Sequence, residues 1–400
     1  MANLNPTAQH DADASANPVA VAKGLHSAIV AARTHIDREQ AFPAELVDAM
    51  RAGNLFQLSL PAAIGGPQHH PLVSFEAVEA LARADGSVGW CASISTSVSL
   101  FSGGWLDPVV ARALFGATPN ATMSGSVRAE GNATITPDGY VVSGQWDFAS
   151  NINQARWMFC TCTLWENGEQ QLTRAGAPRV RTMLIPIEQV TIVPTWSVVG
   201  MRGTGSHDFR VDNVHVPRAH TVSLGDPPAH DGLLYHPRLS MTCAWATTAA
   251  VALGIGRGAV DTFFELANRS GSTASRATLL RDRPRAQESA AQAEAILNSA
   301  RAFLVDAVGT AWDTLSNDSA APGAAIAQAR LAITHAMQES VRAVDKLFHA
   351  AGTNAVYEKN GIERHFRDVH VAAQHAAGQM SHYETAGKAL LGTPLKEPGW

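Results

Sequence analysis

Residues 137–151 read PDGYVVSGQWDFASN, and this stretch marks where the chain changes from helical to strand periodicity. Pro137 presets its own φ and Gly139 accepts a positive φ, so Pro137-Asp138-Gly139 predicts the tight turn of a β-hairpin. Strands are expected on both sides of the turn, at 132–136 and 140–144. Further short strands are expected at 157–164, 182–186, 190–194 and 209–216. Several short strands at this spacing predict a small sandwich or barrel.

Helical periodicity lies on both sides of this strand zone. Apolar residues at 293, 297, 300, 304, 308 and 311 keep a helical rhythm, and long helices are expected at 324–350 and 361–391. The expected fold is therefore mostly α with a central β domain, and it is not doubly wound, because strands and helices do not alternate. We expect a disordered N-terminus at 1–18, an N-terminal helical domain at 19–118, a β domain at 119–228 and a C-terminal helical bundle at 229–400.

Composition excludes several classes of function. The 400 residues are 46% hydrophobic and 16% charged with a net charge of −5, which favours a globular protein and gives no case for nucleic acid or an anionic membrane. Residues 1–18 lack the basic and apolar regions of a signal peptide, so a cytoplasmic location is expected. The four cysteines show no metal-ligand spacing. The glycines at 254, 256 and 258 follow no strand and predict helix packing, so we find no dinucleotide-binding unit.

Three segments at 139–151, 200–217 and 347–375 resemble the acyl-CoA dehydrogenase superfamily, and they occur in the matching order. A fourth segment, 279–287, which we expect to be helical, resembles the oxygenase branch that includes phenol, steroid-ring and thiophene hydroxylases. The resemblance implies an N-terminal helical domain, a small β-barrel or sandwich, and a C-terminal four-helix bundle that forms a homotetramer, a dimer of dimers. It also implies a flavin bound between the β domain and the bundle.

A missing glutamate favours the oxygenase branch. Dehydrogenases of the family abstract a proton with a glutamate that follows an Arg-Asp pair, and counting from Arg367-Asp368 reaches His375 and Ala376. Alanine cannot accept a proton. The resemblance therefore implies the oxygenase component of a two-component flavin-dependent monooxygenase, which uses FMNH2 or FADH2 and O2 through a C4a-(hydro)peroxyflavin. A separate NAD(P)H:flavin reductase is the expected partner, and the substrate is an aromatic or other electron-rich small molecule.

The resemblance also assigns site residues. Ser150 takes the place of a hydroxyl residue near flavin N5, and His375 takes the place of the histidine of the oxygenase branch, as general base or as proton donor. Both are expected to be catalytic, and we expect no metal site. The residues expected to bind the cofactor, besides Ser150, are Ser124, Gly125, Phe148, Arg202, Arg283 and Gly352. The residues expected to contact the substrate are Trp90, Trp146 and His382, the last on the same helix face as His375.

Each assignment has a structural alternative. Ser150 is also a plausible turn residue, His375 a core histidine, and Arg202 and Arg283 members of surface ion pairs. Two other functions remain open at this level: an acyl-CoA dehydrogenase or oxidase with a relocated base, and a flavin-binding scaffold without catalysis. The sequence does not choose between FMN and FAD or identify the substrate.

Overall fold

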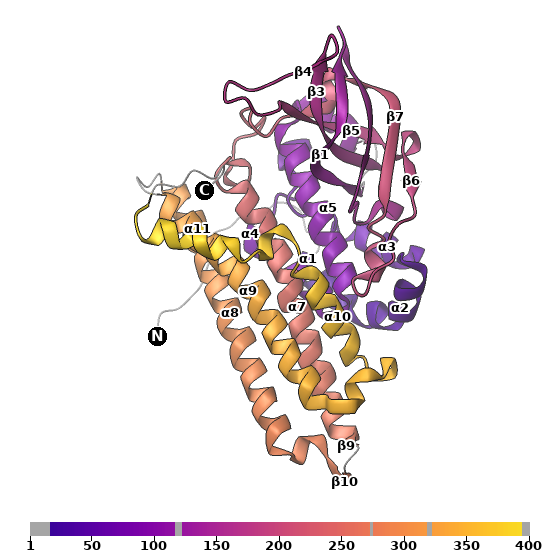
Figure 1. Cartoon of the computed structure of the whole chain (residues 1–400), viewed down its shortest axis with the longest axis vertical. Helices are drawn as coiled ribbons and strands as arrows, with labels where there is room; N and C mark the ends of the chain where they lie inside the picture. The colour runs from indigo at the N-terminus through magenta and orange to yellow at the C-terminus, as the bar shows by residue number, and fades with distance from the viewer. Residues whose placement is uncertain (1–16, 117–121, 273–274, 318–321, 394–400) are drawn as a thin grey trace.

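The computed structural model describes residues 17–116, 122–272, 275–317 and 322–393. Figure 1 shows two groups of helices lying side by side, with a sheet at one end of the molecule. The expected disorder at 1–18 lies almost wholly outside the described residues. Within them, helix α1 begins at Pro18, where the Asn17 side chain accepts a hydrogen bond from the Val19 N–H.

Six helices precede the sheet. They are α1 (Pro18–Gly24), α2 (His26–Glu39), α3 (Ala44–Ala52), α4 (Pro71–Ala84), α5 (Gly86–Trp105) and α6 (Pro108–Gly116). The α5 helix begins where the Asp85 carboxylate accepts hydrogen bonds from the backbone N–H groups of Ser87 and Val88, which satisfies donors that a helix start leaves free. Almost every residue of α5 is buried, so this helix forms a fixed wall against the sheet.

The predicted hairpin is confirmed. Strand β1 (Met123–Ile135) pairs antiparallel with β2 (Gly139–Trp146), and Ile135 lies opposite Tyr140. The sheet order is β6-β7-β2-β1-β3-β5-β8, and β4 pairs with β3. The bounds of these other strands are β3 (Trp157–Glu166), β4 (Glu169–Gln170), β5 (Val180–Pro186), β6 (Thr191–Val193), β7 (Asp208–Pro217) and β8 (Thr221–Val222). The sheet has its own core, in which Trp146 stacks on Phe209 at 5.0 Å between ring centroids.

The helices after the sheet form a bundle. They are α7 (Ser240–Arg269), α8 (Pro284–Ser316), α9 (Pro322–Ala351), α10 (Ile362–Ala372) and α11 (Ser381–Leu390). Strands β9 (Gly271–Ser272) and β10 (Ser275–Leu279) pair between α7 and α8. By length and composition α7 alone among the described helices could cross a membrane, but 89% of its most apolar window is buried inside the protein. It is therefore the central core helix of the bundle.

Glycine packing brings the two helical groups together. A Cβ on Gly254 of α7 would lie 2.5 Å from the backbone oxygen of Glu79 in α4, and a Cβ on Gly256 would lie 2.6 Å from Leu297 of α8. These close approaches confirm that the glycines serve helix packing. Buried residues from before and after the sheet, such as Leu81, Val88, Val251 and Leu347, belong to one apolar core.

Two predicted helices are wrong in detail. The segment 361–391 is not one helix, because it leaves the helical path after Ala372 and His375 takes φ −60° and ψ 151°. A short 3-10 turn, η10 (Ala376–Gly378), and then α11 follow. Side chains from α9 compensate for the broken helix: Thr334 Oγ1 donates to the Ala377 carbonyl at 2.8 Å, and Gln338 Nε2 to the Gly378 carbonyl at 2.7 Å.

The segment 279–287 is not a helix throughout. It contains the end of β10, the 3-10 turn η7 (Leu280–Asp282) and the first turn of α8, which begins at Pro284. Proline suits the first turn of a helix, because its missing N–H would have no helical partner there. Arg283 is therefore the residue that caps the start of α8.

Candidate active site

A cavity of about 440 Å³ lies where the sheet, α5, α7 and the segment after α10 meet. Its wall includes Trp90 from α5, Phe148 and Ser150 from the turn after β2, and His375 from the helix break. A volume of this size lies within the range of ordinary small-molecule sites. Among the described residues that line it, none is an aspartate or glutamate, so these walls offer no carboxylate base.

A directional chain of hydroxyl groups ends at Ser150. Thr204 Oγ1 donates to the Met201 carbonyl at 2.8 Å, so its only proton is committed. The contact of 2.7 Å between Thr204 and Ser206 then requires Ser206 to donate, and the contact of 2.7 Å between Ser206 and Ser150 requires Ser150 to donate. A hydroxyl group has one proton and two lone pairs.

Trp90 completes the hydrogen bonding of Ser150. Its indole Nε1–H donates to Ser150 Oγ at 3.0 Å and occupies one of the two lone pairs. The Ser150 proton points to Ser206, so the remaining lone pair is what Ser150 can offer to the cavity. Ser150 is therefore a hydrogen-bond acceptor toward a ligand, an assignment that follows from the network because hydrogens are placed by inference.

The turn that carries Ser150 is held tightly. Phe148 and Asn151 both take positive φ, at 56° and 69°, which a non-glycine residue adopts only where its surroundings hold it. Ser124 Oγ donates to the Ser150 carbonyl at 2.7 Å, and the Asn151 N–H donates to the Thr204 carbonyl at 2.8 Å. These bonds fix the direction in which the Ser150 hydroxyl points.

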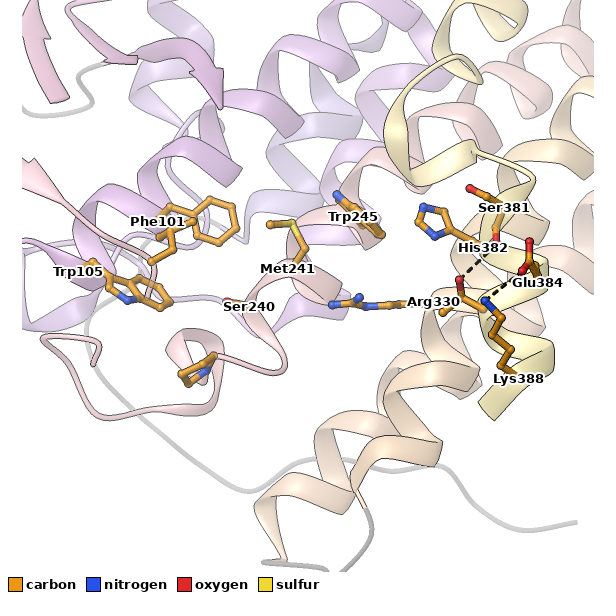
Figure 2. A pocket seen from close by; sticks show the side chains of 13 residues that line it. Phe101, Trp105, Ser240, Met241, Trp245, Arg330, Ser381, His382, Glu384 and Lys388 are labelled. Atoms are coloured by element: carbon orange, nitrogen blue, oxygen red, sulfur yellow. Dashed lines mark hydrogen bonds and ion pairs between the residues drawn. The ribbon is translucent and has the colours of Figure 1, made fainter. Parts of the chain in front are cut away.

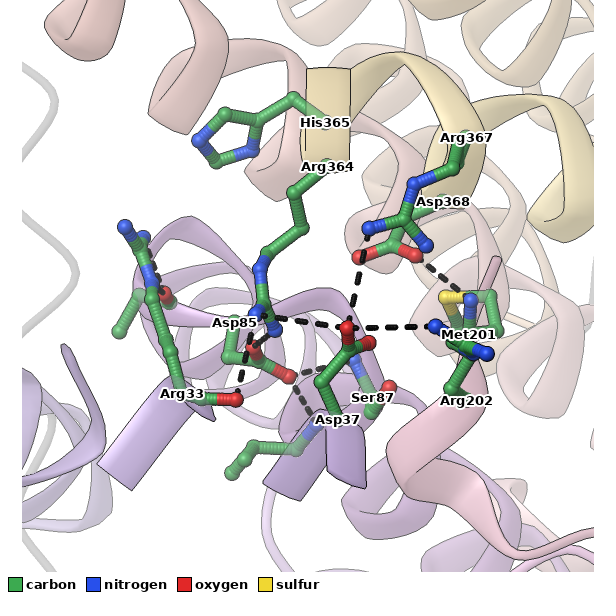
Figure 3. Close-up of polar contacts among 12 residues, drawn as sticks. Arg33, Asp37, Asp85, Ser87, Met201, Arg202, Arg364, His365, Arg367 and Asp368 are labelled. Atoms are coloured by element: carbon green, nitrogen blue, oxygen red, sulfur yellow. Dashed lines mark hydrogen bonds and ion pairs between the residues drawn. The ribbon is translucent and has the colours of Figure 1, made fainter. Parts of the chain in front are cut away.

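Helix α10 holds the loop that carries the hydroxyl chain. The Asp368 carboxylate accepts a hydrogen bond from the Met201 N–H at 2.6 Å, and Arg367 Nη1 donates to the Val199 carbonyl at 2.7 Å. Figure 3 shows these groups in one polar network with Asp37 and Arg364. The Arg-Asp pair of the sequence thus positions the Gly200–Ser206 loop and, through it, Ser150.

His375 is a neutral donor at the cavity wall. Its Nδ1 accepts a hydrogen bond from the Ala377 N–H at 3.2 Å, so the proton of the neutral ring is on Nε2. Burial lowers the pKa of His375 to about 4, although part of its ring is open to the cavity. Its ring meets the Trp90 ring edge-on at 5.4 Å between centroids, which connects His375 to the Ser150 network.

Comparison with protein families and relatives agrees with this geometry. The acyl-CoA dehydrogenase N-terminal domain matches residues 20–102, and the acyl-CoA dehydrogenase C-terminal domain matches residues 246–380. An indole-3-acetate monooxygenase of Pseudomonas putida is 30% identical over 91% of this chain and 90% of its own length. The chain belongs to the flavin-dependent monooxygenase branch of the acyl-CoA dehydrogenase superfamily.

Other relatives of this branch agree. An indole-3-acetate monooxygenase of Acinetobacter baumannii is 29% identical over 89% of each chain. The crystal structure of the HsaA monooxygenase from M. tuberculosis is 26% identical, covers 97% of this chain and 100% of its own, and superposes with a TM-score of 0.83. The chain is thus an oxygenase component that works with a separate component. The expected fold class is confirmed.

The residues of this monooxygenase fit a reduced flavin. Reduced flavin carries a hydrogen on N5, whereas N5 of oxidised flavin has only a lone pair. A serine that can only accept matches the reduced form and leaves the oxidised form without a donor. Aromatic side chains on the wall, among them Phe148 and Trp196, suit a flat ring system.

The structure brings five of the candidate residues of this monooxygenase to the cavity: Trp90, Gly125, Phe148, Ser150 and His375. Ser124 lies directly behind them, on the Ser150 carbonyl. His382 does not share a helix face with His375, because the helix breaks between them, and it lines a second cavity instead. Sequence reasoning missed the roles of Thr204 and Ser206, although it singled out the segment that contains them.

Four other candidates lie elsewhere in the chain. Trp146 is buried in the sheet core, where its Nε1 donates to the Thr161 carbonyl at 2.8 Å, so it does not wall the cavity. Arg202 pairs with Asp37 at 3.6 Å (Figure 3). Arg283 starts α8, and Gly352 follows α9 with φ 60°. None of the four is among the described residues that line this cavity.

Proposed function

We propose that the 440 Å³ cavity binds reduced flavin and a small aromatic substrate, with Ser150 accepting from flavin N5–H and His375 donating from Nε2. The observation that carries this proposal is the direction of the hydroxyl chain, which leaves Ser150 as an acceptor. A bound reduced flavin supplies two electrons to O2, so that one oxygen atom enters the product and the other leaves as water.

Ser150 has two tasks in this proposal. It selects the reduced flavin through the N5–H, and it keeps that hydrogen in place by accepting it in a buried setting, where a hydrogen bond is stronger than in water. Ser150 itself is 6% exposed. Loss of that N5 hydrogen, or entry of water, would release hydrogen peroxide without product, so the walls of the cavity also serve to exclude water.

His375 holds a proton on Nε2 and offers it to an oxygen atom in the cavity. Its Nδ1 is occupied by the Ala377 N–H, so the neutral ring cannot act as a base without first losing the Nε2 proton. Of the two roles that the sequence left open, the structure therefore favours the donor. In the same way the lack of a carboxylate on the described walls favours an oxygenase over a dehydrogenase.

The substrate class and the partner follow from the relatives. Two relatives are named for indole-3-acetate, and another is named an FADH2-dependent resorcinol hydroxylase, oxygenase component. We infer a small aromatic substrate, a separate NAD(P)H:flavin reductase as the source of reduced flavin, and a cytoplasmic location. A homotetramer would bring Arg283 and Gly352, which lie away from the cavity of their own chain, to the flavin of a neighbouring subunit.

Rapid mixing tests the proposal. The chain is loaded anaerobically with chemically reduced flavin and indole-3-acetate or resorcinol, then mixed with O2, and oxygenated product and hydrogen peroxide are both measured. We expect product to exceed peroxide with at least one aromatic substrate, and Ser150→Ala to shift the balance to peroxide. Release of peroxide alone, with every aromatic compound tested, would contradict the proposal.

A further inference from the structure

A second cavity of about 700 Å³ lies beside the first and contains a buried arginine on its wall. Arg330 of α9 is 3% exposed. Figure 2 shows its side chain reaching toward Met241 and Trp245 of α7, with His382 of α11 on the far side of Trp245. A buried cation at the wall of an open cavity is uncommon, because taking a charge out of water is costly.

The guanidinium group of Arg330 is held in place. Its Nε donates to Thr242 Oγ1 at 3.4 Å, and its central carbon lies 5.4 Å from the centre of the Trp245 ring. Burial lowers the pKa of Arg330 to about 10, which leaves the group positively charged at neutral pH. In such a setting an anion meets a fixed planar donor with weak competition from water.

The other charges on the wall do not cancel this cation. Glu384 is the one carboxylate among the described lining residues, and it pairs with Lys388 at 3.0 Å on the same helix. His382 Nε2 donates to the Ala376 carbonyl at 2.8 Å, and burial lowers the pKa of His382, which favours its neutral form. The charges that remain on these walls are therefore positive on balance.

The two cavities are neighbours. Phe101, Met241 and Trp245 line both of them, and the Trp245 ring is in contact with Arg330 on one side of this shared wall. The distance from the guanidinium to the flavin cavity is thus about the width of one indole ring. An aromatic group at the shared wall could reach the reacting side while a short acidic arm reaches Arg330.

We propose that Arg330 binds the carboxylate of an aromatic acid substrate, whose ring lies against Phe101, Met241 and Trp245. This inference rests on the proposed function and narrows its substrate class to aromatic compounds with a short carboxylate arm. The carboxylate accepts two parallel N–H bonds from the guanidinium, and the flexible Met241 side chain adapts the shared wall to the ring. Arg330 sets specificity and takes no part in the oxygen chemistry.

A matched pair of probes tests this site without turnover. Indole-3-acetate and indole-3-acetamide have nearly the same shape, and only the acid is charged. Each is titrated calorimetrically into the anaerobic chain loaded with reduced flavin. We expect wild-type protein to bind the acid at least tenfold more tightly than the amide, and Arg330→Gln to lose most of that preference while amide binding stays within about twofold.

Two further variants keep the result readable. Arg330→Lys retains the charge without the planar fork and should keep a reduced preference for the acid, and it serves if Arg330→Gln does not fold. Glu384→Gln removes a negative charge from the rim and should leave the preference intact or increase it. Melting temperatures of all variants are compared in the absence of ligand.

Three outcomes would overturn the inference. One is a wild-type chain that binds acid and amide equally, and another is an acid preference that survives Arg330→Gln unchanged. The third is a loss of affinity for reduced flavin in Arg330→Gln, which would mean that the guanidinium serves the flavin phosphate. Because no oxygen is admitted, a failure of the chain to hydroxylate would appear only in the mixing experiment and would not alter this titration.

Discussion

The indole Nε1 of Trp90 lies 3.0 Å from Ser150 Oγ, and this bond joins α5 to the turn after β2. The other edge of the same tryptophan faces His375, with ring centroids 5.4 Å apart. Trp90 therefore connects the two residues to which we assign catalytic roles, although they lie far apart in the sequence. Its N–H also occupies a lone pair that Ser150 would otherwise offer to water or ligand.

Trp90→Phe should uncouple the enzyme. The ring against His375 remains, but Ser150 loses a fixed donor and gains a second free lone pair, so its orientation toward flavin N5 becomes less defined. We expect the share of hydrogen peroxide per reduced flavin consumed to rise severalfold. Trp165→Phe is the control, since Trp165 bonds Asn132 in the sheet at 3.0 Å. Equal peroxide yields from both variants would contradict the role given to Trp90.

Ser206→Ala should weaken the choice between reduced and oxidised flavin. Without Ser206 the Ser150 hydroxyl is free to rotate and donate to N5 of oxidised flavin. The ratio of the two dissociation constants, oxidised over reduced, should fall roughly fivefold, as expected for one hydrogen bond. Anaerobic titration of each flavin form measures this ratio.

Thr161→Val is a matched control for Ser206→Ala. Thr161 and Thr182 form another buried hydroxyl pair at 2.9 Å, on the sheet and away from the cavity walls. This variant removes a comparable bond and should leave the ratio of dissociation constants as in wild type. A ratio that falls equally in both variants would indicate a general loss of stability.

His375→Gln should change how stability depends on pH. The pKa of His375 is lowered to about 4 in the folded chain, from 6.5 when unfolded. Between these values the unfolded chain binds a proton that the folded chain does not, so His375 makes wild type less stable as the pH falls from 6.5 to 4. Denaturant melts from pH 4 to 8 should show a smaller loss at low pH for the variant. An identical pH profile would place the His375 pKa near its ordinary value.

Gly254→Ala should destabilise the helical core. The new Cβ would lie 2.5 Å from the Glu79 backbone oxygen, so α4 and α7 must separate, at a cost of about 1–3 kcal/mol. Gly309→Ala in α8 is the control, since its Cβ would meet only Leu72 at 3.9 Å and alanine favours the helix by about 1 kcal/mol. The denaturation midpoint should fall in the first variant and stay level or rise in the second.

Local patterns predicted most of the fold. The Pro137-Asp138-Gly139 turn gave the hairpin, because φ preferences act within a few residues. The apolar repeat of α8 gave its buried face, in which Ala293, Leu297 and Leu304 are fully or almost fully buried. What local patterns could not predict was the break after Ala372. An alanine-rich stretch favours a helix, and the side chains that stabilise the broken path, Thr334 and Gln338, come from α9.

The site was predictable only in part for the same reason. Ser150 and His375 occupy recognisable motifs, whereas the orientation of the Ser150 hydroxyl depends on Thr204, Ser206 and Trp90, which come from other segments. Trp146 was expected near the substrate because it alternates with Phe148 along the chain. The positive φ of Phe148 ends that alternation, so one ring faces the sheet core and the other reaches the cavity.

The anaerobic affinity of the wild-type chain for chemically reduced flavin, compared with oxidised flavin, tests the acceptor role of Ser150 most directly. We expect reduced flavin to bind at least tenfold more tightly, and Ser150→Ala to lose most of that difference. Equal or tighter binding of oxidised flavin by wild type would contradict a Ser150 hydroxyl that can only accept from the ligand.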